Sequence, residues 1–169
     1  MAFAVRLASI QDIPALAAVE LLAAERFNTE TLTAKLAKKT VPDVELQVAC
    51  CAKELWVAES TEQRVVGFLL AEKLDDDLYI SEMSVIPTQG RQGIGGALLE
   101  VAVAHMRAES YKRITLTTFA SVPWNAPFYM KQGFRQMRTT EIGVGLAARI
   151  EQERLLGLFN RVAMCRSDA

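Results

Sequence analysis

The sequence predicts an α/β or α+β fold built on a mixed sheet. A length of 169 residues suits one domain with a substantial core, so we expect a single domain over residues 1–169. Hydrophobic residues make up 51% of the chain and charged residues 23%, which is typical of globular rather than disordered chains. In the second half, runs rich in β-branched residues alternate with helical patterns, and this alternation favours a mixed sheet flanked by helices.

Apolar periodicity and turn residues define the elements of the first half. They are a strand at 3–7, a helix from Ser9 to about Phe27, short helices at 29–39 and 42–52, and strands at 55–59 and 65–70. Ser9 and Asp12, three residues apart, form a capping-box pattern at the start of the first helix. Three consecutive acids, 75–77, cannot all converge on one metal ion, so we interpret them as a solvated turn.

The second half alternates between strands and helices. Its predicted elements are a strand from Tyr79 that ends before Pro87, a helix at 93–109, a strand at 113–119, a short helix from Asn125 to Gly133, a strand at 134–138, a helix at 146–156 and a strand at 158–164. Asn125 suits the cap of the short helix, and Gly133 suits the left-handed position that ends it.

Charge and cysteine content exclude several classes of protein. The formal net charge is −1, so the chain lacks the basic excess expected of a nucleic-acid-binding protein. Cys50, Cys51 and Cys165 show no metal-binding spacing, and their odd number argues against a disulfide framework, so we expect no metal site and a cytoplasmic location. The N-terminus lacks a signal-peptide pattern, and no apolar run is long enough to cross a membrane.

The stretch from Tyr79 to Leu99 is predicted to bind a phosphate compound. It leads from a strand into a segment dense in glycine, residues 90–96, which we call the glycine corner, and then into a helix. The first N–H groups of a helix lack intrahelical partners and attract anions. No Lys completes a Walker A loop, and Leu98 breaks a dinucleotide fingerprint. The remaining interpretation is a pyrophosphate held by backbone N–H groups from Arg91 to Gly96, with added charge from the Arg91 side chain.

Residues 85–99, VIPTQGRQGIGGALL, resemble the acetyl-CoA-binding motif of the GNAT N-acetyltransferase superfamily. Gly93 and Gly95 match the last two positions of that motif, while Gly90 stands where the family has Arg or Gln. A second segment, Asn125 to Phe134, is similar to the family's Asn-containing segment that ends in Tyr-x-x-x-Gly-Phe. The two segments follow each other in the family's order, and the predicted elements agree over most of the chain.

The resemblance implies a twisted mixed sheet of about six or seven strands, flanked by helices and splayed open near Met83 to Val85. Acetyl-CoA would be the cosubstrate, and its pantetheine arm would pair with the backbone of Met83 and Val85 as an added strand does. The cofactor-binding residues expected on this basis are Met83, Ser84, Val85, Gly90, Arg91, Gln92, Gly93, Ile94, Gly95, Gly96, Asn125 and Phe128.

Two catalytic residues are expected. Tyr129 matches the family position whose phenol protonates the CoA thiolate. Glu82 is the first candidate for the general base, acting through water, because strand alternation places it on one face with Ile80 and Ile86, where loss of hydration raises a carboxyl pKa. The alternatives for the base are Glu20, Tyr79 and Glu141.

The expected function is therefore transfer of an acetyl group from acetyl-CoA to a primary amine of a small molecule or protein. Glu20 and Trp124 are candidate substrate-binding residues, Glu20 because a carboxylate interrupts an apolar helix and Trp124 because it precedes the helix of Tyr129. The alternative is an acetyl-CoA-binding sensor or interaction module without turnover. A homodimer is a possible assembly, and neither nucleic acid nor a membrane is an expected partner.

Overall fold

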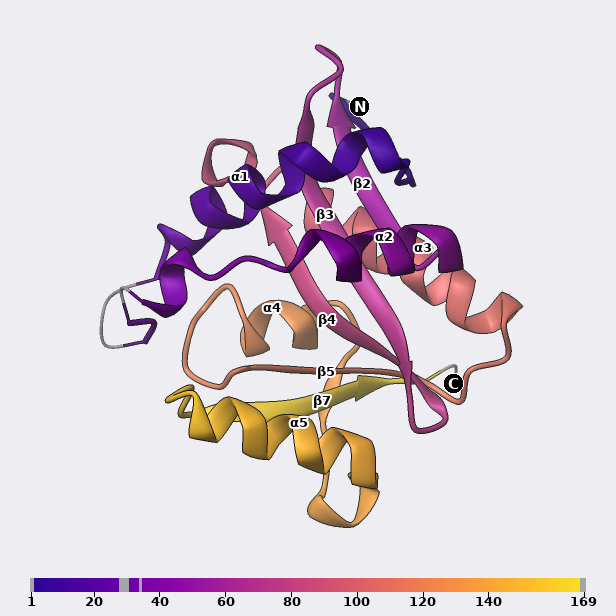
Figure 1. Ribbon diagram of the computed structural model, residues 1–169. Coiled ribbons are helices and arrows are strands. Elements are labelled where there is room, and N and C mark those ends of the chain that lie inside the picture. Colours follow the sequence, from indigo (N-terminus) through magenta and orange to yellow (C-terminus); the bar gives the residue numbers. More distant parts are fainter. Residues whose placement is uncertain (1, 28–30, 34, 168–169) are drawn as a thin grey trace. The chain divides into compact units, whose positions relative to one another are not determined.

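The strands of the computed structural model, which describes residues 2–27, 31–33 and 35–167, form a seven-stranded sheet with the order β1-β2-β3-β4-β5-β7-β6 (Figure 1). The strands are β1 (Phe3–Leu7), β2 (Leu55–Ser60), β3 (Val65–Leu74), β4 (Asp77–Val85), β5 (Ile114–Phe119), β6 (Arg135–Gln136) and β7 (Arg161–Arg166). β4 and β5 pair in parallel, whereas β1 with β2, β2 with β3, β5 with β7 and β6 with β7 pair antiparallel. The predicted mixed sheet is therefore confirmed.

Five α-helices and four 3₁₀ turns connect these strands within the described residues. The helices are α1 (Ile13–Ala24), α2 (Asp43–Ala52), α3 (Ile94–Ala108), α4 (Ala126–Lys131) and α5 (Val144–Leu155), and the turns are η1 (Ile10–Asp12), η2 (Leu36–Lys38), η3 (Pro87–Gln89) and η4 (Thr139–Glu141). None of these helices is long and apolar enough to cross a membrane.

Two local predictions need correction. The helix predicted at 29–39 is reduced to η2 in the described residues, while positions 28–30 and 34 lie outside them. Thr31 and Thr33 precede this turn, and β-branched residues lose side-chain freedom in a helix. The predicted acidic turn is confirmed for Asp75 and Asp76, which are exposed. It is wrong for Asp77, which begins β4 and is buried with its carboxylate 2.9 Å from the Arg113 guanidinium.

The chain divides into two compact units, Met1–Ala71 with Glu82–Ala102, and Glu72–Ser81 with Val103–Ala169. In the first unit, α1 and α2 contact each other and cover strands β2 and β3. Their shared core consists of Ile13, Leu16, Val19, Leu46, Ala49, Leu55, Val57, Phe68 and Leu70. Burial of these apolar side chains is the main stabilising contribution to this unit.

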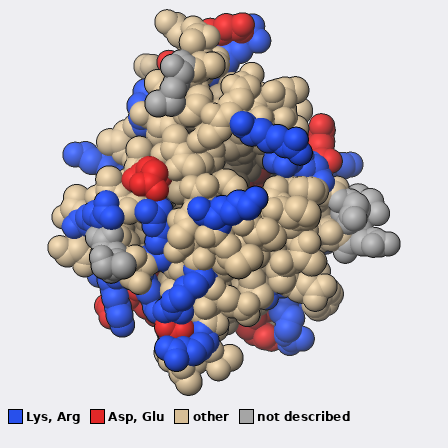
Figure 2. Space-filling model, turned by 180° about the vertical axis from the view of Figure 1, so that it is seen from behind, with Lys and Arg blue, Asp and Glu red and all other residues tan. Residues whose placement is uncertain are grey.

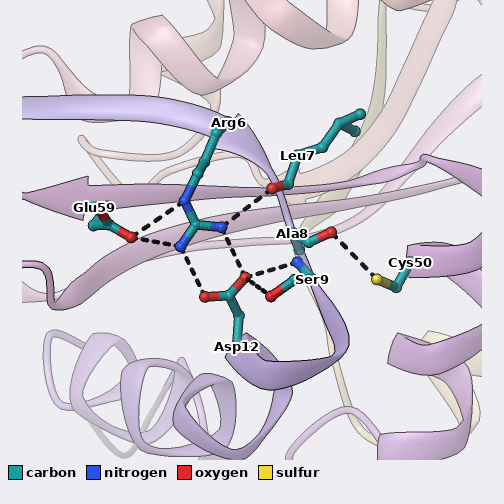
Figure 3. Close-up of polar contacts among 7 residues, drawn as sticks. All are labelled: Arg6, Leu7, Ala8, Ser9, Asp12, Cys50 and Glu59. Atoms are coloured by element: carbon teal, nitrogen blue, oxygen red, sulfur yellow. Dashed lines mark hydrogen bonds and ion pairs between the residues drawn. The ribbon is translucent and has the colours of Figure 1, made fainter.

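The entry into α1 is fixed by a charged cluster around Arg6 (Figure 3). The guanidinium of Arg6 on β1 donates to both carboxylate oxygens of Asp12, at 2.8 and 2.9 Å, and also to Glu59 on β2. The backbone N–H and the hydroxyl of Ser9 donate to the same Asp12 carboxylate, at 2.7 and 2.9 Å. The predicted Ser9–Asp12 start signal is thus confirmed, and the Arg6 bond lowers the pKa of Asp12 to about 2.

The second unit has a smaller core under α5, which lies along β7 (Figure 1). Its buried residues are Tyr79, Met137, Leu146, Ala163 and Cys165. The N-terminus of α5 is capped by Asp75 of the β3–β4 turn, whose carboxylate accepts from the N–H groups of Gly145 and Leu146 at 2.9 and 3.2 Å. This turn therefore supplies the anionic partner that a helix N-terminus favours.

Polar contacts also hold α5 against the strands of its unit. The Glu153 carboxylate accepts a hydrogen bond from the Thr117 hydroxyl on β5. It also forms an ion pair with the Arg161 guanidinium on β7, at 3.0 Å. Arg149 bonds Glu72 on β3 at 2.6 Å. On the face that Figure 2 shows, most Lys and Arg side chains lie in separate groups among uncharged residues.

Candidate active site

The glycine corner joins β4 to α3 in the first unit. After Val85 the chain makes the η3 turn, and the N–H of Gly90 closes it by donating to the Pro87 carbonyl at 3.0 Å. Gly93 then adopts a left-handed φ of 85°, and its carbonyl accepts the first α3 bond from Ala97 at 2.9 Å. Nothing lies within 4 Å of where a Cβ on Gly93 would stand, so the backbone here is open to close approach. The corner has the geometry expected of an anion site at a helix N-terminus.

Arg91 and Gln92 lie on the exposed side of this corner, and Ile94 anchors it. The Arg91 backbone has a left-handed φ of 64°, which is uncommon for a non-glycine residue. Ile94 is only 2% exposed and begins α3, so the corner is fixed to the core at its helical end. Gly95 and Gly96 follow in the first turn of α3, as the sequence predicted.

Gly67 on β3 supports this site, and sequence reasoning missed it. A Cβ at Gly67 would lie 3.0 Å from the Ser84 carbonyl oxygen, 3.1 Å from Val85 Cγ2 and 3.3 Å from Ile94 Cγ2. Those distances are too short for most Cβ contacts, so the glycine lets β3 lie close to the end of β4 and the start of α3. The available sequence signal was a lone glycine within a predicted strand.

The end of β4 presents the segment expected to pair with pantetheine. Met83 and Val85 are half-buried, and Ser84 is only 5% exposed. The described β4–β5 pairs join Leu78–Ile80 to Ile114–Leu116, earlier on β4 than this segment. The splay at Met83 to Val85 and the pantetheine pairing remain predictions.

Glu82 and Glu20 are half-buried carboxylates of the first unit that lie near enough for the charge of one to affect the other. The Ser84 hydroxyl donates to Glu82 at 2.7 Å, which confirms that alternation places these two side chains on one face of β4. Glu20 on α1 is half-buried, and one of its oxygens accepts from the Val41 N–H at 2.9 Å. Burial is the first cause that raises the pKa of Glu20, the charge of Glu82 is the second, and together they bring it to about 7.

Tyr129 lies in the second unit, on the short helix α4. It is 9% exposed, and its ring meets Phe128 and Phe134 edge to face, with centroids 5.2 and 5.6 Å away. Asn125 precedes α4, and its side-chain oxygen accepts the Thr118 hydroxyl at 2.7 Å rather than capping the helix. The Asn125 amide therefore ties α4 to β5. Gly133, with φ of 82°, ends the helix as predicted.

The other candidates differ in suitability. Trp124 is 37% exposed, so it is not a core residue. Burial raises the pKa of Tyr79, which disfavours the phenolate that a base would require. Bonds from Arg135 hold the pKa of Glu141 well below its usual range, which makes that carboxylate a poor proton acceptor. Of the alternatives to Glu82, Glu20 alone has a pKa near neutrality.

The structure thus brings the expected residues together in two groups. The first unit contains the glycine corner, the end of β4, Glu82 and Glu20, and the second contains Trp124, Asn125, Phe128 and Tyr129. Among the described residues, no group of three or more His, Cys, Asp or Glu side chains is arranged to hold a metal ion.

The family model described as the acetyltransferase (GNAT) family matches residues 21–134, which is more than half of the chain. The chain belongs to this family. The matched region includes the glycine corner, Glu82 and the Tyr129 segment, and it begins one residue after Glu20.

Solved structures with the same fold extend this likeness to nearly the whole chain. PaiA N-acetyltransferase from Thermoplasma acidophilum, in complex with coenzyme A, has a TM-score of 0.72 and 16% identity over 99% of this chain and 100% of its own. The ribosomal-protein-S18-alanine N-acetyltransferase of Escherichia coli gives 0.65 and 16% over 99% and 96%. N-acetylglutamate synthase from Neisseria gonorrhoeae, with coenzyme A and N-acetyl-glutamate, gives 0.74 and 18% over 98% of this chain but 35% of its own.

Proposed function

We propose that this protein is an acetyl-CoA-dependent N-acetyltransferase that acts on a primary amine. The observation that supports this most strongly is that the family match includes both the glycine corner and the Tyr129 segment. The open backbone at Gly93 beside the α3 N-terminus fits a pyrophosphate, because the N–H groups there favour anions and no side chain blocks them. Neighbours crystallised with coenzyme A are consistent with this assignment.

Acetyl-CoA supplies an electrophilic thioester, whose carbonyl carbon forms a bond to the amine nitrogen as its bond to sulfur breaks. In the proposed reaction, Tyr129 gives its phenolic proton to the departing sulfur. Glu82 takes a proton from the amine through water. A general acid and a general base each contribute about 10²–10⁴ in rate, so these two residues would supply a large share of the catalysis.

We also propose that the carboxylate of Glu20 acts together with that of Glu82 to bind the cationic acceptor. Two half-buried carboxylates favour an ammonium group over a neutral ligand. A Glu20 pKa of about 7 also means that this carboxyl changes protonation in the pH range where a base must work. Trp124, in the second unit, is proposed as a further substrate-binding residue, and it is 37% exposed.

The test measures the release of free CoA from acetyl-CoA in the presence of a panel of amines. A thiol reagent detects the CoA that is released. The panel spans polyamines, amino acids and peptides with free N-termini. We expect turnover with at least one cationic amine, and mass spectrometry should then show one added acetyl group on that amine. Calorimetry for acetyl-CoA is measured in parallel. Tight binding without turnover on any amine would instead identify a sensor or interaction module.

A further inference from the structure

The solvent side of α1 carries no charge. Its exposed residues are Pro14, Ala15, Ala18, Leu21 and Leu22. Glu20 is the single ionisable residue between Ile13 and Ala24, and its carboxylate accepts from the Val41 N–H rather than lying on this side. A surface helix normally presents polar residues to water, and a helix that is apolar all round is normally covered. The exposed face of α1 therefore has the character of an interface.

A groove of about 430 Å³ runs along this face, within the first unit. One wall is α1, where Ala15, Ala18 and Leu22 line it, and the opposite wall includes Arg64, Val65 and Ile86. The two alanines keep the α1 wall low, so another helix could approach its backbone closely. We call this feature the α1 groove.

The same surface supplies a ridge. Leu21 and Leu22 are 41% and 43% exposed on the helix that forms the groove wall. A surface with both a ridge and a groove is complementary to itself, because a two-fold axis places each ridge in the groove of the other copy. The presence of a ridge and a groove on one face therefore favours a second copy of the chain as the partner.

Charges at the rim agree with a second copy. Glu62 and Arg64 lie two residues apart at the β2–β3 turn, and their side chains are 71% and 79% exposed. Their contact within one chain is 3.6 Å long and solvated, so both remain available to a partner. Around a two-fold axis, each charge can meet its opposite on the other copy. An anionic membrane fits less well, because no Lys or Arg lies between Ile13 and Ala24.

We propose that the chain forms a two-fold homodimer in which the α1 grooves of two copies interlock. The face is apolar at its centre and charged at its rim, as expected of specific interfaces. The inference does not depend on acetyl transfer, since none of the interface residues belongs to the proposed catalytic set.

Sedimentation equilibrium of the full chain tests the central contact. We expect a dimer for the wild type and for Val48→Glu, a control that adds the same charge at an exposed valine of α2 outside the groove, 65% exposed. Ala18→Glu should raise the dissociation constant by roughly a hundredfold, because a two-fold axis buries two unpaired carboxylates. A monomeric wild type, or equal dimerisation of Ala18→Glu, would overturn the proposal.

Charge reversal at the β2–β3 turn provides a second test that leaves the apolar α1 wall of the groove unchanged. Glu62→Arg and Arg64→Glu should each weaken the dimer by roughly tenfold through like-charge contacts, and the double reversal should restore it. Both residues are exposed, so these variants are expected to fold even if Ala18→Glu does not. A dimer indifferent to both single reversals would place the interface elsewhere.

Discussion

Glu20 of the first unit and three carboxylates of the second unit have opposite electrostatic surroundings. In the second unit, Asp77, Glu141 and Glu153 each contact an arginine, at 2.9, 2.7 and 3.0 Å. In the first unit, the charge that most affects Glu20 is another carboxylate, Glu82. Pairing stabilises the ionised form and fixes a fold, whereas burial beside a like charge leaves a group poised to exchange a proton.

Within the first unit, Asp12 shows that the difference follows role rather than location. Its carboxylate is paired with Arg6 at 2.8 Å and positions the start of α1. The Glu20 carboxylate, within α1, accepts instead from the backbone N–H of Val41 at 2.9 Å. The comparison therefore separates carboxylates paired with arginine from those proposed to take part in the reaction. The following predictions test it from the largest expected effect to the smallest.

Gly95→Glu should abolish acetyl-CoA binding. The change adds bulk and a negative charge to the first turn of α3, where the proposed pyrophosphate meets backbone N–H groups. Isothermal titration calorimetry measures the loss, and circular dichroism checks that the fold is kept. Normal affinity would rule out the glycine corner as a phosphate site.

Arg113→Met should destabilise the protein by about 3 kcal/mol, because it leaves the Asp77 charge buried without its partner. The two side chains are 13% and 7% exposed. Urea unfolding measures the change. The matched control is Arg154→Met, whose pair with Glu151 is exposed and should contribute about 0.5 kcal/mol or less. Equal losses for the two variants would remove the distinction between structural pairs and solvated ones.

Tyr129→Phe should slow turnover by roughly tenfold or more while acetyl-CoA affinity stays nearly unchanged. The substitution removes the proposed acid but keeps the ring that packs against Phe128 and Phe134. Single-turnover kinetics give the rate, and Phe134→Leu is a control that alters the packing around Tyr129 but keeps its phenol. If the Tyr129 variant reacts at the wild-type rate, the phenol has no part in the mechanism.

Glu20→Gln should stabilise the protein at pH 8 but not at pH 5. Folding raises the pKa of Glu20 from 4.5 to about 7, so the folded protein is favoured when this carboxyl is protonated. The stability of the protein therefore falls as the pH rises from about 4.5 through about 7. Removing the charge should gain about 1 kcal/mol at pH 8, allowing for solvent screening. Urea midpoints at both pH values provide the test, and an equal change at each would show that the effect is not ionisation.

Local patterns were enough to predict most of the fold. Alternation gave β1, β2 and β5, and the Ser9–Asp12 signal located the start of the first helix. The glycine corner could be predicted from the sequence because close backbone approach and a left-handed φ favour glycine at position 93. These features depend on neighbours in the sequence, so a single chain reveals them.

The remaining features depend on residues far apart in the sequence. Glu20 and Glu82 belong to different elements, and alternation within β4 says nothing of a carboxylate on α1. Gly67 matters because of the atoms of Ser84 and Ile94, which the β3 sequence does not contain. Asp77 reads as a solvated acid until Arg113 is placed beside it. Each of these facts follows from tertiary contact rather than local propensity.

The cap that Asp75 provides to α5 spans 70 residues of sequence. A Cβ at Gly145 would lie 2.9 Å from the Asp75 carboxylate, and a Cβ at Gly143 would also collide with it. Substitutions in the turn and at the start of the helix are consequently expected to depend on each other. Across descendants of this chain, an acid at position 75 and glycines at positions 143 and 145 should be kept or lost together, so that α5 can be exchanged between relatives only with the turn that holds it.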